Sequence, residues 1–351
     1  MKQFYPLSTF LTEYSEKNIG NTYRPVAVGR YGIRTRESIY SKELAKDYSK
    51  NKLIHKNTLT VGMGSVQIDI GVLTDDITYS VSPAYHTYKI AGVNAEYLRY
   101  CLECRNQDMF SRFVKRGSRQ GKTIDLKRWL TYEIPVYDEN RQQEIVDRLN
   151  QISELIEKRQ EQLVQLSELV KSRFIELFGD PVSNPKDWNV EPLGNRCGII
   201  TGNTPPRSEP ENYGKYIEWI KSDNINTPFT FITKAQECLS EAGFEKCRFV
   251  EAGSILMTCI AGSIDCIGNV AVTDRRVAFN QQINAIVPEQ DEVLYLYWLM
   301  QLSKPMIHRT INMALKGILS KSQLSEIVFP FPPITLQEQF AALVEQTDKS
   351  K

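Results

Sequence analysis

The chain has 351 residues, 41% of them hydrophobic and 24% charged, which is typical of a globular protein large enough for two domains. A formal net charge of +1 excludes a protein that is basic throughout, so any binding to nucleic acid must come from local patches. No stretch approaches about 18 consecutive apolar residues, which excludes a transmembrane helix. Seven cysteines, an odd number scattered without a disulfide framework, favour a reducing cytoplasm.

The first globular region, residues 1–138, is predicted to combine short strands with helices. Residues 59–74, LTVGMGSVQIDIGVLT, are rich in Val, Ile and Thr and have Gly at turn positions, which is typical of strands. A helical pattern over residues 94–116 follows, and then a polar segment that contains two glycines. A short strand at residues 132–137 ends the region, so we expect an α+β domain.

A single long helix is predicted within residues 139–181, where apolar residues recur at alternating spacings of three and four with one skipped position. About 38 helical residues would extend roughly 57 Å at ~1.5 Å per residue. Gly179 ends the pattern and Pro181 prevents its continuation. An ordinary amphipathic helix of one domain is the alternative, but so long a heptad seam indicates a helical partner of similar length. The seam consists of Ile145, Leu149, Ile152, Ile156, Leu163, Leu166, Val170, Phe174 and Leu177.

The second globular region, residues 182–333, has the same order of patterns as the first. A β-like run covers residues 255–273, a helical pattern covers residues 291–311, and a short strand ends in prolines at residues 327–333. A further helix begins in residues 334–351 and resembles the start of the long helix. The sequence stops at Lys351, so we expect this helix to be too short to pair along the whole seam.

The two globular regions resemble each other when the sequence is shifted by about 198 residues. Tyr97 then falls on Tyr295, and Gln142 falls on Gln339. A period this large indicates two duplicated domains rather than a solenoid. We therefore expect two α+β domains, joined by the long helix.

Three segments carry a resemblance to a known family. They are ELVKSRFIELFGDP at 168–181, TGNTPPRSEPENYGKYIEWIKSDNI at 201–225 and PPITLQEQFAALVEQTDKSK at 332–351. In these segments and in its arrangement, the chain resembles the specificity (S) subunit of type I restriction–modification enzymes. The resemblance covers essentially the whole chain.

The resemblance implies a fold and a set of partners. The domains at 1–138 and 182–333 would be target-recognition domains, each reading one half of a split site in double-stranded DNA. The helices at 139–181 and 334–351 would form an antiparallel coiled-coil spacer that docks methyltransferase (M) subunits, two of them in this family, and restriction (R) subunits would join the complex. Half-sites one helical turn apart are about 34–36 Å from each other, which a rod of roughly 57 Å can span.

The first region contains the clearest basic segment, residues 114–128, with six positive charges and one negative charge. Gly117 and Gly121 indicate a loop, which can neutralise phosphates and bring Arg, Gln and Ser to base edges. Residues 30–38 combine three arginines with Tyr31 and are a second candidate. The alternative for both segments is a solvated surface loop or turn. The predicted DNA contacts of this region are Arg34, Arg36, Lys115, Arg116, Ser118, Arg119, Gln120 and Lys122.

In the second region, short segments combine side chains that suit base edges. Residues 204–207 place a rigid Pro turn next to an arginine, and residues 221–224 bring a lysine together with short polar side chains. Asn and Gln suit adenine, Arg and Lys suit guanine, and Asp suits the cytosine amine. The resemblance also implies that the loop at 279–284 lies near DNA, although its side chains can equally cap a turn within the fold. The predicted contacts are Thr204, Arg207, Lys221, Ser222, Asp223, Asn224, Asn280, Gln281 and Lys316.

Motifs for catalysis or for cofactor and metal binding are weak. VGMGSV at residues 61–66 lacks the third glycine of a nucleotide loop. Cys101 and Cys104 form one CxxC, and no second pair follows at zinc spacing. We therefore expect a non-catalytic chain without a metal or cofactor of its own. The resemblance places S-adenosylmethionine, ATP and Mg on the partner subunits.

Other interpretations remain open at this point. The chain can be a truncated S subunit that acts as a homodimer or paired fragment on a symmetric site. A fused methyltransferase is disfavoured by the missing motifs and by the length, and a coiled-coil scaffold that binds no DNA is disfavoured by the two duplicated domains with a basic loop. The near-neutral charge predicts weak, salt-sensitive DNA binding by the chain alone and tight binding together with M subunits.

Overall fold

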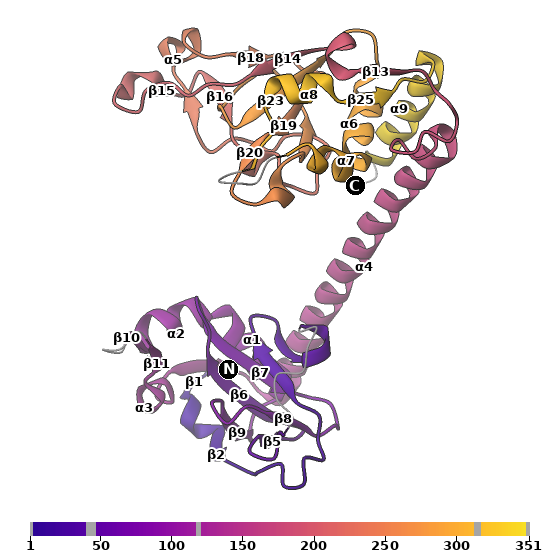
Figure 1. The fold of residues 1–351 in the computed structure, drawn as a ribbon. Helices are drawn as coiled ribbons and strands as arrows, with labels where there is room; N and C mark the ends of the chain where they lie inside the picture. The colour runs from indigo at the N-terminus through magenta and orange to yellow at the C-terminus, as the bar shows by residue number, and fades with distance from the viewer. Residues whose placement is uncertain (1–2, 40–46, 117–120, 312–316, 349–351) are drawn as a thin grey trace. The chain divides into compact units, whose positions relative to one another are not determined.

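The computed structural model describes residues 3–39, 47–116, 121–311 and 317–348. The chain divides into unit 1, Met1–Lys158, and unit 2, Arg159–Lys351, and the long helix α4 (Glu139–Phe178) belongs to both (Figure 1). Outside the described residues lie Ser118, Arg119, Gln120, Lys316 and the side chain of Arg116.

Unit 1 is built around a four-stranded antiparallel sheet with the strand order β2-β9-β6-β7. Leu59, Val61 and Tyr88 from this sheet are buried in one cluster with Leu98 and Trp129 from the helices. Alternating apolar residues along the strands therefore form the core, and the strands predicted from the Val, Ile and Thr content of residues 59–74 are present. The strands are β2 (Leu11–Tyr14), β6 (Thr58–Met63), β7 (Ile68–Leu73) and β9 (His86–Ile90).

Two-stranded pairs and short helices surround this sheet. The helix α1 begins at a cap, because the Asn94 side chain accepts a hydrogen bond from the backbone N–H of Tyr97 at 3.0 Å. The helices are α1 (Ala95–Cys104), α2 (Asn106–Phe113) and α3 (Leu126–Trp129). The pairs are β1 (Gln3–Pro6) with β12 (Glu133–Val136), β3 (Val26–Gly29) with β4 (Gly32–Thr35), β5 (Lys52–Ile54) with β8 (Tyr79–Val81), and β10 (Val114–Arg116) with β11 (Lys122–Ile124).

The helix α4 has 40 residues, and both of its ends are determined locally. At the start, the Asp138 carboxylate accepts the backbone N–H of Arg141 at 3.1 Å. At the end, Gly179 has φ +81°, and a Cβ atom there would lie 2.7 Å from the ring of Pro185. Only glycine fits this position without displacing Pro185. The predicted long helix that ends at Gly179 is confirmed.

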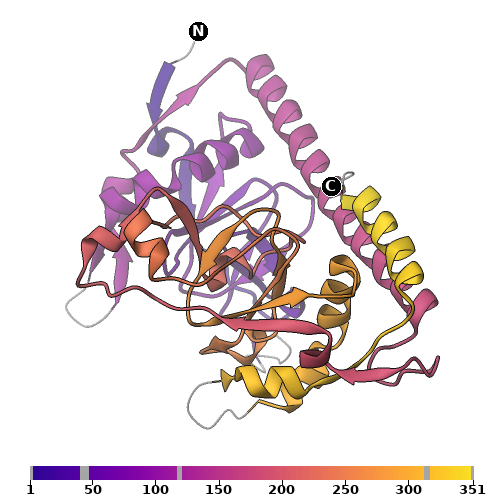
Figure 2. The ribbon, with the colours of Figure 1, turned by 90° about the horizontal axis from the view of Figure 1, so that it is seen from above.

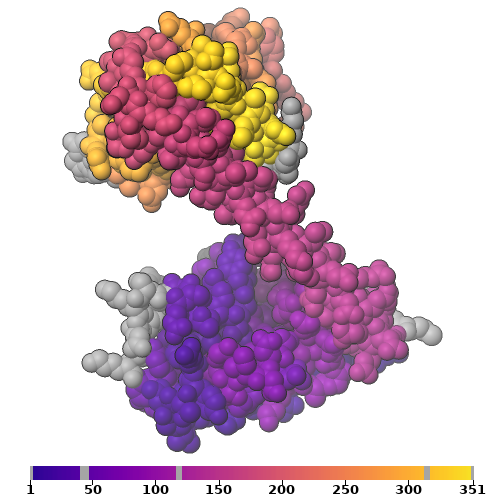
Figure 3. All heavy atoms as spheres, turned by 90° about the vertical axis from the view of Figure 1, so that its right-hand side faces the viewer, coloured from indigo at the N-terminus to yellow at the C-terminus, as the bar shows by residue number. Residues whose placement is uncertain are grey.

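The predicted seam of α4 is buried only toward the ends of the helix. Val170 and Phe174 are buried in the core of unit 2, where the rings of Phe174 and Phe340 lie 5.4 Å apart. Phe340 belongs to α9 (Ile334–Asp348), which runs alongside the last turns of α4 (Figures 1 and 2) and is visible on the surface of unit 2 (Figure 3). Half-buried seam residues are Ile145, Leu149, Leu166 and Leu177. The exposed ones are Ile152, Ile156 and Leu163, at 53%, 52% and 40%.

Unit 2 contains a four-stranded sheet with the order β14-β23-β19-β21 and a second sheet with the order β15-β17-β16-β22-β18. Ile220 and Phe279 from the second sheet share a buried cluster with Leu256 and Ala285 from the first, so the two sheets pack against each other. The first sheet consists of β14 (Cys197–Thr201), β19 (Ile255–Thr258), β21 (Val270–Val272) and β23 (Ile283–Pro288). The second consists of β15 (Tyr213–Gly214), β16 (Ile217–Ile220), β17 (Cys238–Leu239), β18 (Phe249–Val250) and β22 (Val277–Phe279).

The remaining elements of unit 2 cover these sheets. The helix α6 is the most buried of them, and the ring of Tyr295 in α6 stacks on Phe174 at 5.6 Å. The helices are α5 (Glu241–Glu245), α6 (Val293–Leu302), α7 (Lys304–Arg309) and α8 (Lys321–Glu326). The strand pairs are β13 (Val190–Pro192) with β25 (Val328–Pro330) and β20 (Ile260–Ala261) with β24 (Gly317–Ile318).

The two units are structural copies of each other. Their central sheets have the same strand order when β2, β9, β6 and β7 are matched to β14, β23, β19 and β21. The hydroxyl of Tyr97 donates to the carbonyl of Pro135 at 2.8 Å, and that of Tyr295 donates to the carbonyl of Pro330 at 2.7 Å. The predicted duplication and the equivalence of the two tyrosines are confirmed.

One predicted equivalence is wrong. Gln142 accepts the backbone N–H of Asn94 at 2.9 Å and donates to the carbonyl of Tyr137 at 2.8 Å. In unit 2 the residue with these bonds is Gln337, which accepts the N–H of Glu292 and donates to the carbonyl of Pro332, both at 2.9 Å. The shift at this point is therefore 195 residues instead of 198. The segment between helix α6 and the final helix is three residues shorter than its counterpart in unit 1.

Candidate functional site

Three polar loops of unit 2 meet at one edge of its sheets. The strands β16 and β22 are parallel neighbours, with Ile220 opposite Phe279, so their carboxyl ends lie at the same edge. The loops 221–224 and 280–282 follow these strands directly. A third loop, 202–207, follows β14. It is attached to the same edge by the hydrogen bond from the backbone N–H of Asn203 to the carbonyl of Phe279 at 3.2 Å.

Side chains from the three loops contact one another. The Thr204 hydroxyl donates to the Gln281 side-chain oxygen. The side-chain oxygen of Gln282 accepts from the Ser222 hydroxyl at 3.2 Å and from the Asn280 amide at 3.3 Å. The structure thus brings together Thr204, Ser222, Asn280 and Gln281, which the sequence placed in three separate candidate segments.

Two cations of these loops share one carboxylate. The Arg207 guanidinium forms two hydrogen bonds to Glu237, one of them 3.0 Å long, and the Lys221 ammonium also binds Glu237. Arg207 lies 4.5 Å from the ring centre of Tyr213, and Lys221 lies 5.1 Å from that of Trp219. The hydrogen bond from Arg207, together with that from Lys221, lowers the pKa of Glu237 to about 2.

The two remaining predicted contacts of this region differ in exposure. Asp223 is exposed, so its carboxylate is accessible. Asn224 is 5% exposed, and its side chain accepts the backbone N–H of Lys221 at 3.1 Å and donates to the carbonyl of Lys234 at 3.1 Å. These are the bonds of a side chain that caps a turn within the fold.

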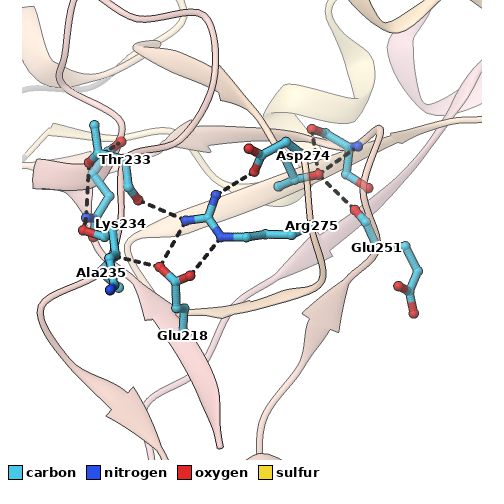
Figure 4. A network of polar contacts seen from close by, with 10 residues as sticks. Glu218, Thr233, Lys234, Ala235, Glu251, Asp274 and Arg275 are labelled. Atoms are coloured by element: carbon cyan, nitrogen blue, oxygen red, sulfur yellow. Dashed lines mark hydrogen bonds and ion pairs between the residues drawn. The ribbon is translucent and has the colours of Figure 1, made fainter. Parts of the chain in front are cut away.

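Glu218 and Arg275 form a clamp that attaches β16 to the residues just before β22 (Figure 4). The Glu218 carboxylate of β16 accepts from Arg275 at 2.7 and 2.9 Å, and also from the backbone N–H of Ala235 at 2.7 Å. Arg275 in turn donates to the carbonyl of Thr233 at 3.3 Å. The bond from Arg275 lowers the pKa of Glu218. The carboxylate therefore stays charged at neutral pH and ties three segments of unit 2 together.

In unit 1, the predicted arginines lie beside aromatic rings. The β3–β4 hairpin places the Arg34 guanidinium 5.1 Å from the ring centre of Tyr31, which is 70% exposed. Arg36 lies 5.3 Å from the ring centre of Tyr48. Arg36 also lines a hollow of about 290 Å³, whose other lining residues are Ala27, Gly62, Met63, Ser82, Ala84 and Tyr85.

The basic segment of unit 1 was predicted to be a loop, and this is wrong for much of its described part, because β10 and β11 pair as strands and residues 126–128 begin α3. Part of the charge of the segment is engaged within the unit. Lys115 pairs with Asp125 at 2.7 Å, which lowers the pKa of Asp125. Lys122 donates to the carbonyl of Ser65 at 2.5 Å and lies 5.3 Å from the ring centre of Phe110. Both lysines are exposed and remain accessible to a ligand.

Glu237, Tyr213 and Trp219 belong to the site but did not stand out in the sequence. Glu237 is 30 residues from Arg207 along the chain, and only the pairing of β17 with β16 brings it into place. Trp219 lies two residues before Lys221, so an aromatic residue beside a cation was the one available signal.

The part of the chain that the structure describes contains no group of three or more His, Cys, Asp or Glu side chains arranged to hold a metal ion. Within the same residues, none of the helices combines the length and the apolar character that crossing a membrane requires.

Comparisons with known proteins agree on one family. The family described as "Type I restriction modification DNA specificity domain" matches residues 12–166 and 185–351. The chain is 34% identical over 117 residues to the specificity subunit of the HindI type I restriction enzyme of Haemophilus influenzae, covering 32% of this chain and 24% of that protein. It is 28% identical over 176 residues to the MjaIX specificity subunit of Methanocaldococcus jannaschii, covering 47% of this chain and 38% of that protein. These alignments therefore span less than half of either relative.

Solved structures show the same fold. The crystal structure of an S subunit of a type I restriction–modification system from M. genitalium matches with a TM-score of 0.60 at 15% identity, over 100% of this chain and 90% of that one. A structure described under the assembly and conformational transition of the type I system matches with a TM-score of 0.50 at 16% identity, over 99% and 91%. Because the family matches twice and each matched segment covers most of one duplicated unit, the chain belongs to the family of type I restriction–modification DNA specificity domains.

Proposed function

We propose that the chain is a DNA specificity subunit of a type I restriction–modification system and that each unit reads one half of a split site in double-stranded DNA. The observation that carries this proposal is that the two units repeat one fold, including the order of the central four-stranded sheet, but carry different polar surfaces. The elements that accompany these sheets differ, with arginines beside tyrosine rings at the β3–β4 pair of unit 1 and the Arg207–Lys221–Glu237 cluster beside β16 and β17 of unit 2. A duplicated frame with two unlike surfaces suits the recognition of two unlike half-sites.

The partners would supply the chemistry. We propose that methyltransferase subunits, two of them, and restriction subunits bind this chain in the cytoplasm and carry S-adenosylmethionine, ATP and Mg, while this chain stays non-catalytic. The exposed apolar side chains in the middle of α4, such as Ile152 and Ile156 at 53% and 52%, support a docking role for this helix. The near-neutral charge supports weak, salt-sensitive DNA binding by the chain alone and tighter binding in the complex.

Co-expression with a methyltransferase subunit, followed by methylation-aware sequencing of the host DNA, tests the proposal. A split motif with methylated adenines is the expected result. A palindromic or half-length motif would instead indicate a truncated subunit that acts as a homodimer or paired fragment. Absence of any motif would contradict DNA recognition.

Single variants in the same assay test whether each unit reads one half of the site. Arg34→Ala is expected to relax the sequence requirement in one half of the motif, and Arg207→Ala is expected to relax it in the other half. Loss of a base contact costs about 1–3 kcal/mol, roughly a 5- to 150-fold change in discrimination. Effects of both variants on the same half would contradict the assignment of one half-site to each unit.

A further inference from the structure

We propose that Glu237 is a specificity-determining residue: its carboxylate holds Arg207 and Lys221 at the loop surface of unit 2 and keeps them from DNA phosphates, so that sequence-independent binding stays weak. This inference rests on the proposed function and names a residue that sets its selectivity. Three features carry it, namely the anchoring of Glu237, the aromatic surface beneath the cations, and the position of the cluster at the edge where the three loops meet.

Glu237 is held rigidly by the frame. It directly precedes β17, and its backbone carbonyl accepts the N–H of Trp219 in β16 at 3.1 Å. Its side chain is 27% exposed, whereas that of Arg207 is 57% exposed and that of Lys221 is 35% exposed. The carboxylate therefore lies beneath two more accessible cations and approaches them from the protein side.

The aromatic residues determine where the cations can go. Arg207 lies 4.5 Å from the ring centre of Tyr213 and 5.3 Å from that of Trp219, and Lys221 lies 5.1 Å from that of Trp219. The same rings fix the 202–207 loop, because the Tyr213 hydroxyl donates to the Pro205 carbonyl at 2.8 Å. Cation–π contacts and the shared carboxylate together restrain both side chains before any DNA arrives.

Such restraint favours base contacts over phosphate contacts. A phosphate must compete with a carboxylate whose charge-assisted bonds are already formed. A guanidinium has five N–H donors, and Glu237 engages two of its nitrogens, so Arg207 retains donors for a base edge. Because phosphate contacts supply most of non-specific binding, a paired carboxylate weakens that binding more than it weakens specific binding.

A similar arginine–carboxylate pair at the amino end of β22 offers a control, because the loop edge lies at the carboxyl end of this strand. Arg276 directly precedes β22, donates to Glu251 at 2.8 Å, and lies 5.4 Å from the ring centre of Phe249. This is also an exposed arginine beside a carboxylate and an aromatic ring, but it lies at the amino end of β22, away from the 280–282 loop. Glu251→Gln changes the charge by the same amount as Glu237→Gln and leaves the loop edge intact.

The experiment compares the wild type, Glu237→Gln and Glu251→Gln, each purified as the full chain with its methyltransferase subunits. Binding to a random-sequence duplex and to a duplex with the methylated motif is measured over a range of salt concentrations. For Glu237→Gln we expect affinity for the random duplex to rise about tenfold, and the logarithmic salt slope to steepen by about 0.9 for each cation that gains a phosphate. The preference for the motif should fall accordingly, while Glu251→Gln should behave as the wild type.

A second variant keeps the test informative. Lys221→Met added to Glu237→Gln should return the salt slope toward the wild-type value by about 0.9, because one released cation is removed. Circular dichroism confirms that each variant is folded. If Glu237→Gln keeps the wild-type slope and affinity, or loses only motif binding, the inference is overturned. If the wild-type complex binds no DNA at all, the proposed function fails and the inference fails with it. This outcome is distinguishable from an unchanged Glu237→Gln variant and from a variant that loses only motif binding, because in both of those cases the wild type binds DNA.

Discussion

Arg34 of unit 1 and Arg207 of unit 2, both predicted to contact DNA, are held in different ways. In unit 1, Arg34 lies 5.1 Å from the ring centre of Tyr31, on a hairpin whose tip is exposed. In unit 2, Arg207 and Lys221 share the carboxylate of Glu237 and lie on two aromatic rings. The first arrangement leaves the charge of the arginine available to phosphates, and the second offsets part of it.

The frames beneath these surfaces are alike. Gln142 and Gln337 make the same pair of backbone bonds, and Tyr97 and Tyr295 donate to equivalent proline carbonyls. A buried group that loses its partner costs about 1–3 kcal/mol, whereas an exposed ion pair contributes only about 0–1 kcal/mol. Exposed contacts can therefore differ between the copies at little cost in stability, while the buried bonds stay the same.

The largest expected effect tests the common frame. Gln337→Ala would leave the N–H of Glu292 and the carbonyl of Pro332 unpaired in a buried place, and would also remove the bond to Asp291 at 2.8 Å. We expect unit 2 to lose about 3–4 kcal/mol in its free energy of unfolding. Hydrogen exchange of the amides around Glu292 measures this loss.

The matched variant is Gln142→Ala, which removes two bonds instead of three. We expect unit 1 to lose about 2–3 kcal/mol, reported by the amides around Asn94. If only one of the two variants lowers the unfolding free energy of its unit, the two glutamines do not have equivalent structural roles.

A smaller effect is expected where the frames differ. Glu218→Gln would remove the charge that Arg275 binds in the clamp of unit 2 (Figure 4), where the two side chains are 21% and 32% exposed. We expect a loss of about 2 kcal/mol, because the clamp joins three segments and is partly shielded from water. Hydrogen exchange of β16 and of residues 233–235 measures it. The control Glu251→Gln should leave both segments close to wild type, and equal exchange in the two variants would contradict a structural role for the clamp.

The sequence predicted the parts of this comparison that depend on local pattern. The α+β class, the duplication, the long helix and its end at Gly179 all follow from spacing and from residue types with strong preferences. The equivalence of Gln142 with Gln339 was wrong because two glutamines lie close together at 337 and 339, and a three-residue difference in a connecting segment cannot be located from one sequence.

The site was predicted only in part, for a physical reason. Residues 204–207 and 221–224 were identified by composition, and the loop at 279–284 by the family resemblance. Their convergence depends on β16 and β22 being parallel neighbours, which a short apolar run does not reveal. Glu237 reaches the cluster through a strand of two residues, too short to leave a periodic pattern. Asn224 is polar but 5% exposed, and no local signal separates a buried cap from an exposed contact.

The smallest expected effect concerns the pH dependence of unit 2. The pKa of Glu237 is lowered to about 2, chiefly by its hydrogen bond with Arg207. The pKa of a glutamate in an unfolded chain is about 4.3. A lowered pKa adds stability that is fully present above the unfolded value and is lost as the pH falls through the folded value. Between about pH 4.3 and pH 2, the wild type should therefore lose more unfolding free energy than Glu237→Gln does.

We expect this difference to be about 1 kcal/mol, because water and salt screen a cluster whose arginine is 57% exposed. Chemical denaturation at several pH values measures it, with Glu251→Gln as the control for the loss of one carboxylate. Added salt should reduce the difference. Identical pH profiles for the wild type and Glu237→Gln would show that the carboxylate does not hold the two cations in solution, and Arg207 would then present its charge as Arg34 of unit 1 does.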